Sequence, residues 1–190
     1  MPGQHFGTIR RCTPADAPVL AELGARLFRE AYGTTHPEPD LTPYLAQTFD
    51  PRQLATELAQ PEVCVLFALD ASHQAIGYGY ARASDAARPA SVPGLRPWEI
   101  LRFYVDAQWQ GRGVAAPLFA ACTWEARQQG ADAIWLAVWQ EASRPQAFYR
   151  RMGLEVVGTT VFKFGQRRDA DFVLAMPLHP PEMIRRRPTV

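Results

Sequence analysis

The segment between residues 97 and 139 constrains the fold most, because its pattern changes from strand to helix and back to strand. The runs WEILRFYVD and ADAIWLAVW are apolar and rich in β-branched and aromatic residues, which favours strands. Between them, VAAPLFAACTWEARQQG spaces its apolar residues as a helix does and ends at Gly130. Two strands joined by such a crossover are parallel and right-handed. The unit therefore predicts the centre of a sheet with a helix on one face.

The flanking sequence adds five predicted strands and three predicted helices. The strands are FGTIRRC, EVCVLFALD, AIGYGYARA, EVVGTTVFKF and DFVLAMPL. One helix begins after Thr13, with Asp16 three residues on, and ends near Gly33; another opens with Asp50 and Pro51. SRPQAFYRRMG predicts a short helix, and the proline-rich THPEPDLTPY predicts a loop. The order β-α-α-β-β-β-α-β-α-β-β indicates the α+β class, with antiparallel meanders around the crossover.

Length and composition set the outer limits. The 190 residues are 47% hydrophobic, so we expect a single domain over residues 1–178 and a loose tail over 179–190. Lys and Arg number 20 against 19 Asp and Glu, which favours neither nucleic acid nor an anionic membrane as the partner. The three cysteines fit neither a disulfide framework nor a paired-cysteine metal site. No apolar leader or membrane-spanning run is present, so we expect a cytoplasmic protein.

The turn VDAQWQGRGVAA, over residues 105–116, has the character of a phosphate cradle. It joins a strand to the start of a helix, where successive amides from Gln110 to Ala115 can point into one concavity at the positive helix end. Gly111 and Gly113 leave room for an anion, and Arg112 adds positive charge at the rim. A lone GRG by itself favours a loop that merely enters a helix, and the flanking residues shift the balance toward function.

A dinucleotide-binding fingerprint is the competing interpretation of this turn. GRGVAA satisfies G-x-G-x-x-A, and Glu141 follows the next strand where a ribose-binding acid could lie. The spacing argues against it, because five residues, DAQWQ, separate the strand from the first glycine, whereas a dinucleotide fold turns almost at once.

The ordered motifs of this chain resemble the GNAT family of N-acetyltransferases. The family signature Q/R-x-x-G-x-G/A is matched by Gln110, Gly113 and Ala115. The strand EILRFYV before the loop, the helix after it, the strand WLAVW and the segment AFYRRMGLEVVG match in the same order. The stretch WLAVWQEASRPQAFYRRMGL, with VFKFGQRRDADFVLAMPL after it, is most similar to the branch of PaiA-type polyamine acetyltransferases.

The resemblance implies a fold and a donor site. The expected fold is a mixed sheet of about seven strands, splayed between the two strands of the crossover, with about four helices. Acetyl-CoA is the implied co-substrate, and no metal is implied. Its pantetheine arm would pair with the main chain at residues 103–105, with the Val105 amide facing the developing oxyanion. The implied donor-binding residues are Phe103, Tyr104, Val105, Gln110, Gly111, Arg112, Gly113, Val114, Ala115 and Ser143.

Two catalytic roles follow from the same resemblance. Tyr149, in AFY, matches the tyrosine that protonates the departing thiolate; without the resemblance, an apolar helix stripe with Phe148 and Met152 would be the preferred interpretation. Glu99 matches a strand glutamate that serves as the base for the acceptor ammonium. Its alternative is a structural ion pair, with Arg102 or Arg10 as the partner.

The chain departs from the family pattern at the start of the helix that carries Tyr149. Ala142 replaces a common asparagine, and Pro145 replaces an alanine, which a first helical turn tolerates. Ser143 is the residue that could compensate by capping the helix. Ala116 stands where a basic residue often follows the cradle, so phosphate affinity would depend on amides and on Arg112.

The acceptor is expected to be a primary amine attacked directly in a ternary complex. Glu30, Glu38, Asp40 and Tyr44 would form an acidic, aromatic entrance that suits a polyamine or another small amine. A peptide or protein N-terminus is the alternative acceptor, and a catalytically silent acyl-CoA-binding module is the alternative class. The resemblance also allows a homodimer. The four histidines lack ligand spacing and predict solvated loops, and the five tryptophans predict core or rim packing.

Overall fold

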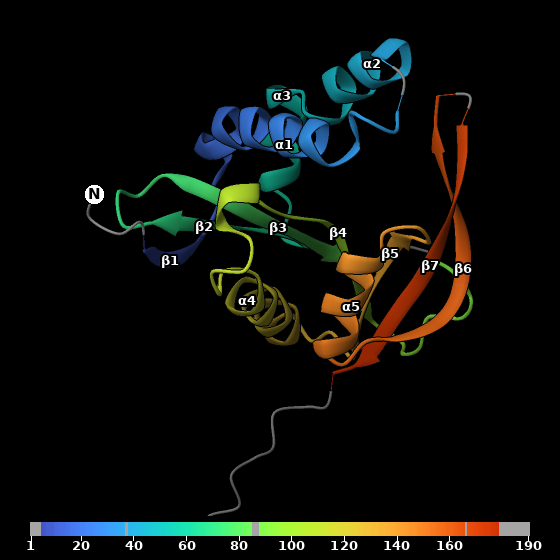
Figure 1. Cartoon of the computed structure of the whole chain (residues 1–190). Coiled ribbons are helices and arrows are strands. Elements are labelled where there is room, and N and C mark those ends of the chain that lie inside the picture. Colours follow the sequence, from blue (N-terminus) through green and yellow to red (C-terminus); the bar gives the residue numbers. More distant parts are fainter. Residues whose placement is uncertain (1–4, 37, 85–87, 166, 179–190) are drawn as a thin grey trace, which may run out of the picture.

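A single sheet runs through the structure, with helices over both of its faces (Figure 1). The computed structural model describes residues 5–36, 38–84, 88–165 and 167–178; the predicted tail at 179–190 lies outside them. The strands are β1 (Phe6–Arg11), β2 (Val63–Asp70), β3 (Ala75–Ala83), β4 (Pro97–Val105), β5 (Ala133–Trp139), β6 (Glu155–Phe164) and β7 (Arg167–Pro177). The α-helices are α1 (Ala17–Tyr32), α2 (Glu38–Thr48), α3 (Pro51–Leu58), α4 (Ala115–Gln128) and α5 (Ser143–Arg151).

The strand order is β1-β2-β3-β4-β5-β7-β6, and only β4 and β5 run parallel among these neighbours. The α4 helix joins this parallel pair, as the strand–helix–strand pattern predicts. All seven predicted strands are present, so the α+β class and the mixed sheet are confirmed.

Two hydrophobic cores fill the space on either side of the sheet. In Figure 1, α1, α2 and α3 lie over one face, and α4 and α5 lie over the other. Leu118 and Cys122 of α4 are fully buried against sheet residues such as Ile134. On the opposite face, Leu20 of α1 packs in a core with Phe67 of β2. The helix-rich face forms a roof over the sheet, and the β6–β7 hairpin rises beside α2 (Figure 1).

The predicted helix starts are present with their expected hydrogen bonds. The Thr13 amide donates to the Asp16 carboxylate at 2.8 Å before a 3₁₀ turn, Pro14–Asp16, leads into α1. Asp50 accepts hydrogen bonds from the amides of Arg52 and Gln53 at 2.8 and 2.9 Å, which caps α3.

The prediction of a loop over THPEPDLTPY was wrong for its second half, because α2 begins at Glu38. Pro39 lies in the first helical turn, where a missing amide hydrogen costs nothing. Pro43 lies inside the helix and forgoes one hydrogen bond. Burial of Leu41 and Leu45 against the core offsets this loss, so tertiary packing overrides the local proline signal.

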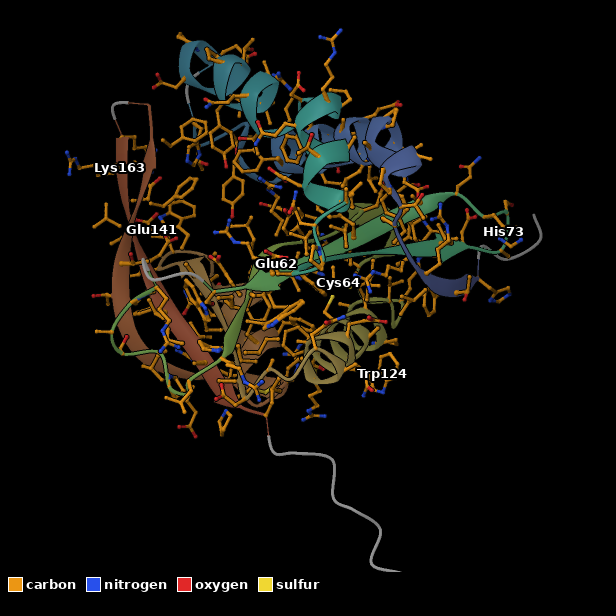
Figure 2. The ribbon with its side chains drawn as sticks, turned by 180° about the vertical axis from the view of Figure 1, so that it is seen from behind. Glu62, Cys64, His73, Trp124, Glu141 and Lys163 are labelled. Carbon is orange, nitrogen blue, oxygen red and sulfur yellow. The ribbon has the colours of Figure 1, made fainter. Side chains whose placement is uncertain are left out.

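The tryptophan prediction holds except at one position. Trp98, Trp109 and Trp135 are buried, and Trp139 is half-buried at the end of β5. Trp124 instead points outward from α4 and is 56% exposed (Figure 2). Its side chain therefore does not pack in the core.

Gly24 sets how closely α1 approaches the end of α2. A Cβ atom at this position would collide with the ring of Phe49, which is itself buried in the core under α1. The contact matters for function because α1 and α2 together roof one side of the sheet.

We expect Gly24→Ala to destabilise the protein by about 1–3 kcal/mol, because the clash outweighs the gain in helix propensity of about 1 kcal/mol. Urea denaturation of the two proteins measures the difference. Adding Phe49→Leu to Gly24→Ala should recover part of the loss by making room. A single variant as stable as the wild type would show that α1 moves away at no cost.

Candidate active site

The sheet opens between β4 and β5. The two strands pair only where residues 97–99 of β4 meet residues 133–135 of β5, and they diverge beyond that point. Residues 101–105 are consequently only half-buried, although β4 is a central strand. A cavity of about 270 Å³ fills the opening, and we call it the cleft cavity. Its walls include residues 100–105 of β4, residues 136–138 of β5, and Tyr149 of α5.

Main-chain amides of β4 face this cavity. The Asp106 amide donates to the Ile76 carbonyl at 2.9 Å, so hydrogen bonding to β3 falls on alternate residues. The amides of Val105 and Phe103 therefore point away from β3, toward the side of β5. The main chain of Tyr104 is turned to β3, and this residue lines the cavity through its side chain.

The loop at residues 110–115 adopts the shape that its glycines allow. Gly111 and Gly113 have φ angles of +79° and +81°, which residues with a Cβ rarely adopt. A Cβ at either glycine would meet no atom within 4 Å, so conformation rather than crowding requires glycine here. The side-chain amide of Gln110 donates to the Val105 carbonyl at 3.0 Å and ties the loop to the end of β4.

A second cavity, the loop cavity, joins this loop to α5. It is lined by Gln110, Gly111, Gly113, Val114 and Ala115 from the predicted donor-binding set. No side chain caps the start of α4, so its first amide groups lack the partner that a capping residue would supply. This cavity therefore lies at the positive end of a helix.

Three arginines surround the loop cavity. Arg112 stacks over the Trp109 ring at 5.6 Å, so it stands beside the cavity at the tip of the loop. Arg144 and Arg151, both exposed on α5, line the cavity directly. Sequence reasoning missed these two, because the motif spacing says nothing about which α5 side chains face a loop thirty residues earlier.

Tyr149 forms a wall between the two cavities. It lines both of them, is 8% exposed, and packs its ring against Phe103, Phe119 and Phe148 with centroids 5.3–6.3 Å apart. Among the described residues, no side chain or carbonyl forms a hydrogen bond with its hydroxyl. Burial raises the pKa of Tyr149 well above its usual value, so the phenol keeps its proton at neutral pH.

The turn from β5 into α5 is held by a residue outside the predicted set. Ala142 occupies the N-cap position with no side-chain hydrogen bond, and Ser143 is the first helical residue, exposed and outside the loop-cavity lining. The buried Gln146 side chain instead donates to the carbonyls of Trp139 and Gln140 at 3.0 and 2.8 Å. A glutamine from inside the helix thus anchors the turn that Ser143 was expected to cap.

Glu99 lies on a third cavity and is engaged in an ion pair. Its Oε2 atom accepts from Nε and Nη2 of Arg82 at 2.8 and 2.7 Å across the β3–β4 ladder. The structure thus gives Glu99 an arginine partner, but this is Arg82 and neither Arg102 nor Arg10. Arg10 pairs with Asp16.

This third cavity, the hairpin cavity, has a volume of about 200 Å³ and lies between the roof helices and the β6–β7 hairpin. It lies beside the cleft cavity, because both are lined by the same stretch of β4 and by Tyr32 and Ala137. Its full lining is Phe28, Tyr32, His36, Tyr44, Glu99, Ile100, Leu101, Arg102, Tyr104, Ala137, Trp139, Phe162, Asp169 and Asp171.

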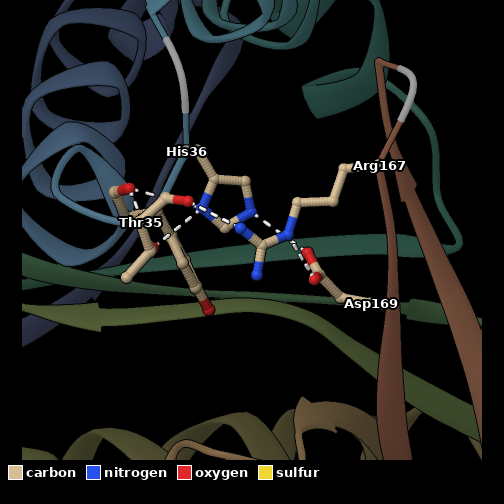
Figure 3. A network of polar contacts seen from close by, with 5 residues as sticks. Thr35, His36, Arg167 and Asp169 are labelled. Atoms are coloured by element: carbon tan, nitrogen blue, oxygen red, sulfur yellow. Dashed lines mark hydrogen bonds and ion pairs between the residues drawn. The ribbon is translucent and has the colours of Figure 1, made fainter.

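The expectation of a solvated loop was wrong for His36, which is 5% exposed in this cavity. Figure 3 shows the ring of His36 and the guanidinium of Arg167 both directed at the Asp169 carboxylate, with Thr35 beside the ring. His36 Nε2 lies 3.2 Å from Asp169 Oδ2, and Arg167 Nε lies 2.5 Å from Oδ1. Arg167 also donates to the Thr35 carbonyl at 2.7 Å, which joins the hairpin to the end of α1. His179 lies outside the described residues.

Asp171 is another carboxylate of this cavity, and among the described residues it has no histidine or arginine partner of the kind that Asp169 has. It lies two residues after Asp169 on β7, so both side chains project from the same face of the strand. Asp171 is 8% exposed, and among the described residues none forms a hydrogen bond or ion pair with it. Burial and the nearby charge of Asp169 raise the pKa of Asp171 to about 6. Sequence reasoning missed it, since a single Asp in an edge hairpin carries no signal.

The predicted acidic entrance is largely neutralised. Glu30 pairs with Arg26 and Glu38 pairs with Arg29, each at 2.8 Å. Asp40 lines an outer groove between α2 and the hairpin, together with Lys163, which lies near the hairpin turn (Figure 2). Of the four residues, Tyr44 alone lines the hairpin cavity.

The described residues also bear on metal binding and on membrane association. Their His, Cys, Asp and Glu side chains form no group of three that could hold a metal ion. None of the helices they form combines the length and apolar character needed to cross a membrane.

Comparison with known proteins identifies the family. Residues 25–154 match the Acetyltransferase (GNAT) family, so the chain belongs to this family and is an N-acetyltransferase. An uncharacterized N-acetyltransferase of Lactobacillus delbrueckii subsp. lactis is 28% identical over 164 residues, covering 86% of this chain and 92% of the relative. An aminoglycoside N(6′)-acetyltransferase type 1 of Stenotrophomonas maltophilia is 29% identical over 160 residues, covering 82% and 90%.

The fold is shared with solved structures. The PaiA N-acetyltransferase of Thermoplasma acidophilum, solved in complex with coenzyme A, superposes with a TM-score of 0.68 at 18% identity. The match covers 90% of this chain and 98% of that one. The splayed sheet expected from the sequence is thus the observed fold.

We expect Asp171→Asn to stabilise the protein at pH 8 by about 1–2 kcal/mol, less than the full pKa shift implies because cavity water screens the charge. The folded pKa lies above the unfolded value, so the charge destabilises the fold above about pH 6. The gain should shrink as the pH falls from about 6 toward the unfolded value of 3.8, and vanish below about pH 3, where the carboxyl is protonated in both states.

Thermal denaturation across this pH range measures the effect. Asp16→Asn is the control of opposite sign, because the hydrogen bond from Arg10 holds the pKa of Asp16 below its usual range and the variant should lose stability at pH 8. A gain from Asp171→Asn that is the same at pH 4 and pH 8 would contradict a buried charge.

Proposed function

We propose that the protein transfers an acetyl group from acetyl-CoA to a small primary amine. The observation that supports this most is the cleft cavity, where two parallel strands part and leave main-chain amides of one strand facing an open channel. The channel leads to the loop cavity at the positive end of α4.

The donor would lie along β4. Amides of Phe103 and Val105 would pair with the extended pantetheine arm as they would with a neighbouring strand. The diphosphate would contact the amides of residues 110–115 at the start of α4. Arg144 and Arg151, with Arg112 beside them, would add charge-assisted contacts to the phosphate oxygens.

The reaction can be written with its atoms and protons balanced. The acceptor ammonium gives one proton to a carboxylate of the hairpin cavity, directly or through water. The neutral nitrogen attacks the thioester carbonyl carbon, and the Val105 amide stabilises the oxyanion. The carbon–sulfur bond breaks, and the thiolate takes the Tyr149 proton. The phenolate is then reprotonated by the remaining excess proton on the amide nitrogen.

Two carboxylates could receive the first proton. Glu99 was the sequence-based candidate, and its position on the hairpin cavity suits the role, although Arg82 already pairs with it. Asp171 lies on the same cavity without an ion-pair partner among the described residues. Its raised pKa is also closer to neutral pH than the pKa of an ordinary aspartate, which suits a general base.

We propose small primary amines in general, and not polyamines alone, as the acceptor class. The acids expected to attract a polycation, Glu30 and Glu38, are paired with arginines at the surface. The hairpin cavity is small, at about 200 Å³, and its aromatic walls suit a compact amine. A peptide N-terminus would have to enter through the outer groove beside α2.

We expect purified protein to release CoA thiol from acetyl-CoA only when a primary amine is added. A thiol-reactive dye would follow this across spermidine, short alkylamines, amino acids, an aminoglycoside and peptides. Mass spectrometry of the product should show one acetyl group on nitrogen. Binding of acetyl-CoA without thiol release for any amine would favour the silent binding module instead.

Tyr149→Phe should lower kcat by about 10²–10⁴-fold with little change in acetyl-CoA affinity, because only the proton donor is lost. Steady-state kinetics and calorimetry with CoA measure the two quantities. Tyr80→Phe is the matched control, since its hydroxyl bonds to Glu57 away from the three cavities. An unchanged kcat at saturating substrate would exclude Tyr149 as the acid.

A further inference from the structure

We infer that the acceptor is an amphoteric primary amine, bound in the hairpin cavity with its ammonium on Asp171 and an anionic group on Arg102. This inference rests on the proposed function and narrows its substrate class. It depends on one negative and one positive side chain that line the same cavity and have no ionic partner among the described residues.

The first of these is Asp171. A carboxylate that is 92% buried is costly to maintain without a hydrogen-bond donor or a cation, because burial removes its hydration. Its neighbour Asp169 has both, in His36 and Arg167. Tyr32, whose pKa is raised mainly by burial and further by the Asp171 charge, faces the same space. A ligand ammonium would supply the missing partner.

The second is Arg102, on the β4 side of the cavity. Its guanidinium carbon lies 5.0 Å from the Tyr80 ring and 5.4 Å from the Phe49 ring, and none of the described residues gives it a carboxylate partner. Stacking on rings leaves the edge of the guanidinium, with its N–H donors, available to an anion. Arg102 also lines the outer groove, so an anionic group could reach it from that side.

The other charges around the cavity are matched. Glu99 pairs with Arg82 and Asp169 with Arg167. On the nearby roof, Glu30 and Glu38 also have arginine partners. The unpaired charges are therefore one of each sign, a pattern that an amine with an anionic group satisfies. A simple alkylamine would leave Arg102 without a partner, and a second ammonium on a diamine would be repelled by it.

The position of the hairpin cavity also suits the proposed attack of the amine on the thioester. The hairpin cavity and the cleft cavity share the wall formed by Tyr32, Ala137, Tyr104 and residues 100–102. An amine that binds at Asp171 would therefore lie next to the opening between β4 and β5, which would hold the thioester.

The test compares matched amines. Omega-amino acids from glycine to 6-aminohexanoate are assayed beside the alkylamine and the diamine of the same chain length, with thiol release as the readout. In the wild type, the best amino acid should have a KM at least about tenfold below that of its alkylamine and its diamine. Calorimetry with each amine in the presence of CoA gives affinity independently of turnover.

Two variants test the two ends of the bound amine, and a third serves as the control. Asp171→Asn should raise KM about tenfold or more for all three classes while the KM for acetyl-CoA stays unchanged. Arg102→Gln should remove the advantage of the amino acid over the alkylamine and leave the alkylamine KM near wild type. Glu38→Gln, an exposed charge change outside the cavity, should change neither the KM for the amines nor the advantage of the amino acid over the alkylamine. Circular dichroism and the pH-dependent stability of Asp171→Asn show that the variant is folded.

The outcomes separate this inference from the proposed function. A diamine preferred over its amino acid, or an Asp171→Asn protein with wild-type amine KM, would overturn the inference while acetyl transfer stands. Equal losses in Arg102→Gln for amino acids and alkylamines would overturn the role of Arg102. If the wild type does not bind acetyl-CoA, the proposed function and this inference both fail.

Discussion

The early end of pairing between β4 and β5 is the constraint on which the site depends. Hydrogen bonding between them stops after Glu99 and Trp135, although both strands continue for several residues. Unpaired main-chain groups in the middle of a sheet are costly unless water or a ligand satisfies them. The cleft cavity in this opening shares lining residues with the hairpin cavity and with the loop cavity, and Tyr149 lies at the boundary with the loop cavity. If β4 and β5 paired along their whole length, no opening would remain in which the proposed donor and acceptor could meet.

Local patterns in the sequence predict the central crossover, two helix starts and the glycine turn well. The crossover from 97 to 139, the helix starts at Thr13 and Asp50, and the glycine turn each depend on neighbours within a few residues. Gly111 and Gly113 illustrate why, since their positive φ angles are a property of the turn itself. The roles assigned to Tyr149 and Glu99 came from family resemblance, and the structure adds where these residues lie.

The acceptor half could not be predicted in the same way, because its residues meet only through tertiary contacts. His36 is paired with Asp169, 133 positions later, so a scan for ligand spacing treats it as a loop residue. Asp171 gains its character from burial beside Asp169 in a β-hairpin. The α2 helix forms despite Pro43 because its leucines find a core. In each case the deciding interaction lies outside any sequence window.

The β6–β7 hairpin has a wider consequence. It contributes Asp169 and Asp171 to the acceptor side, yet it lies beyond residue 154, where the match to the family ends. The cavity's opposite wall, Phe28 to Tyr44, comes from the beginning of the chain. In the proposed reaction, residues of the central stretch would handle the thioester, and the amine would be recognised by Arg102 of that stretch together with the two flanks. Evolution could exchange the flanks and redirect such an enzyme to new amines without rebuilding its chemistry.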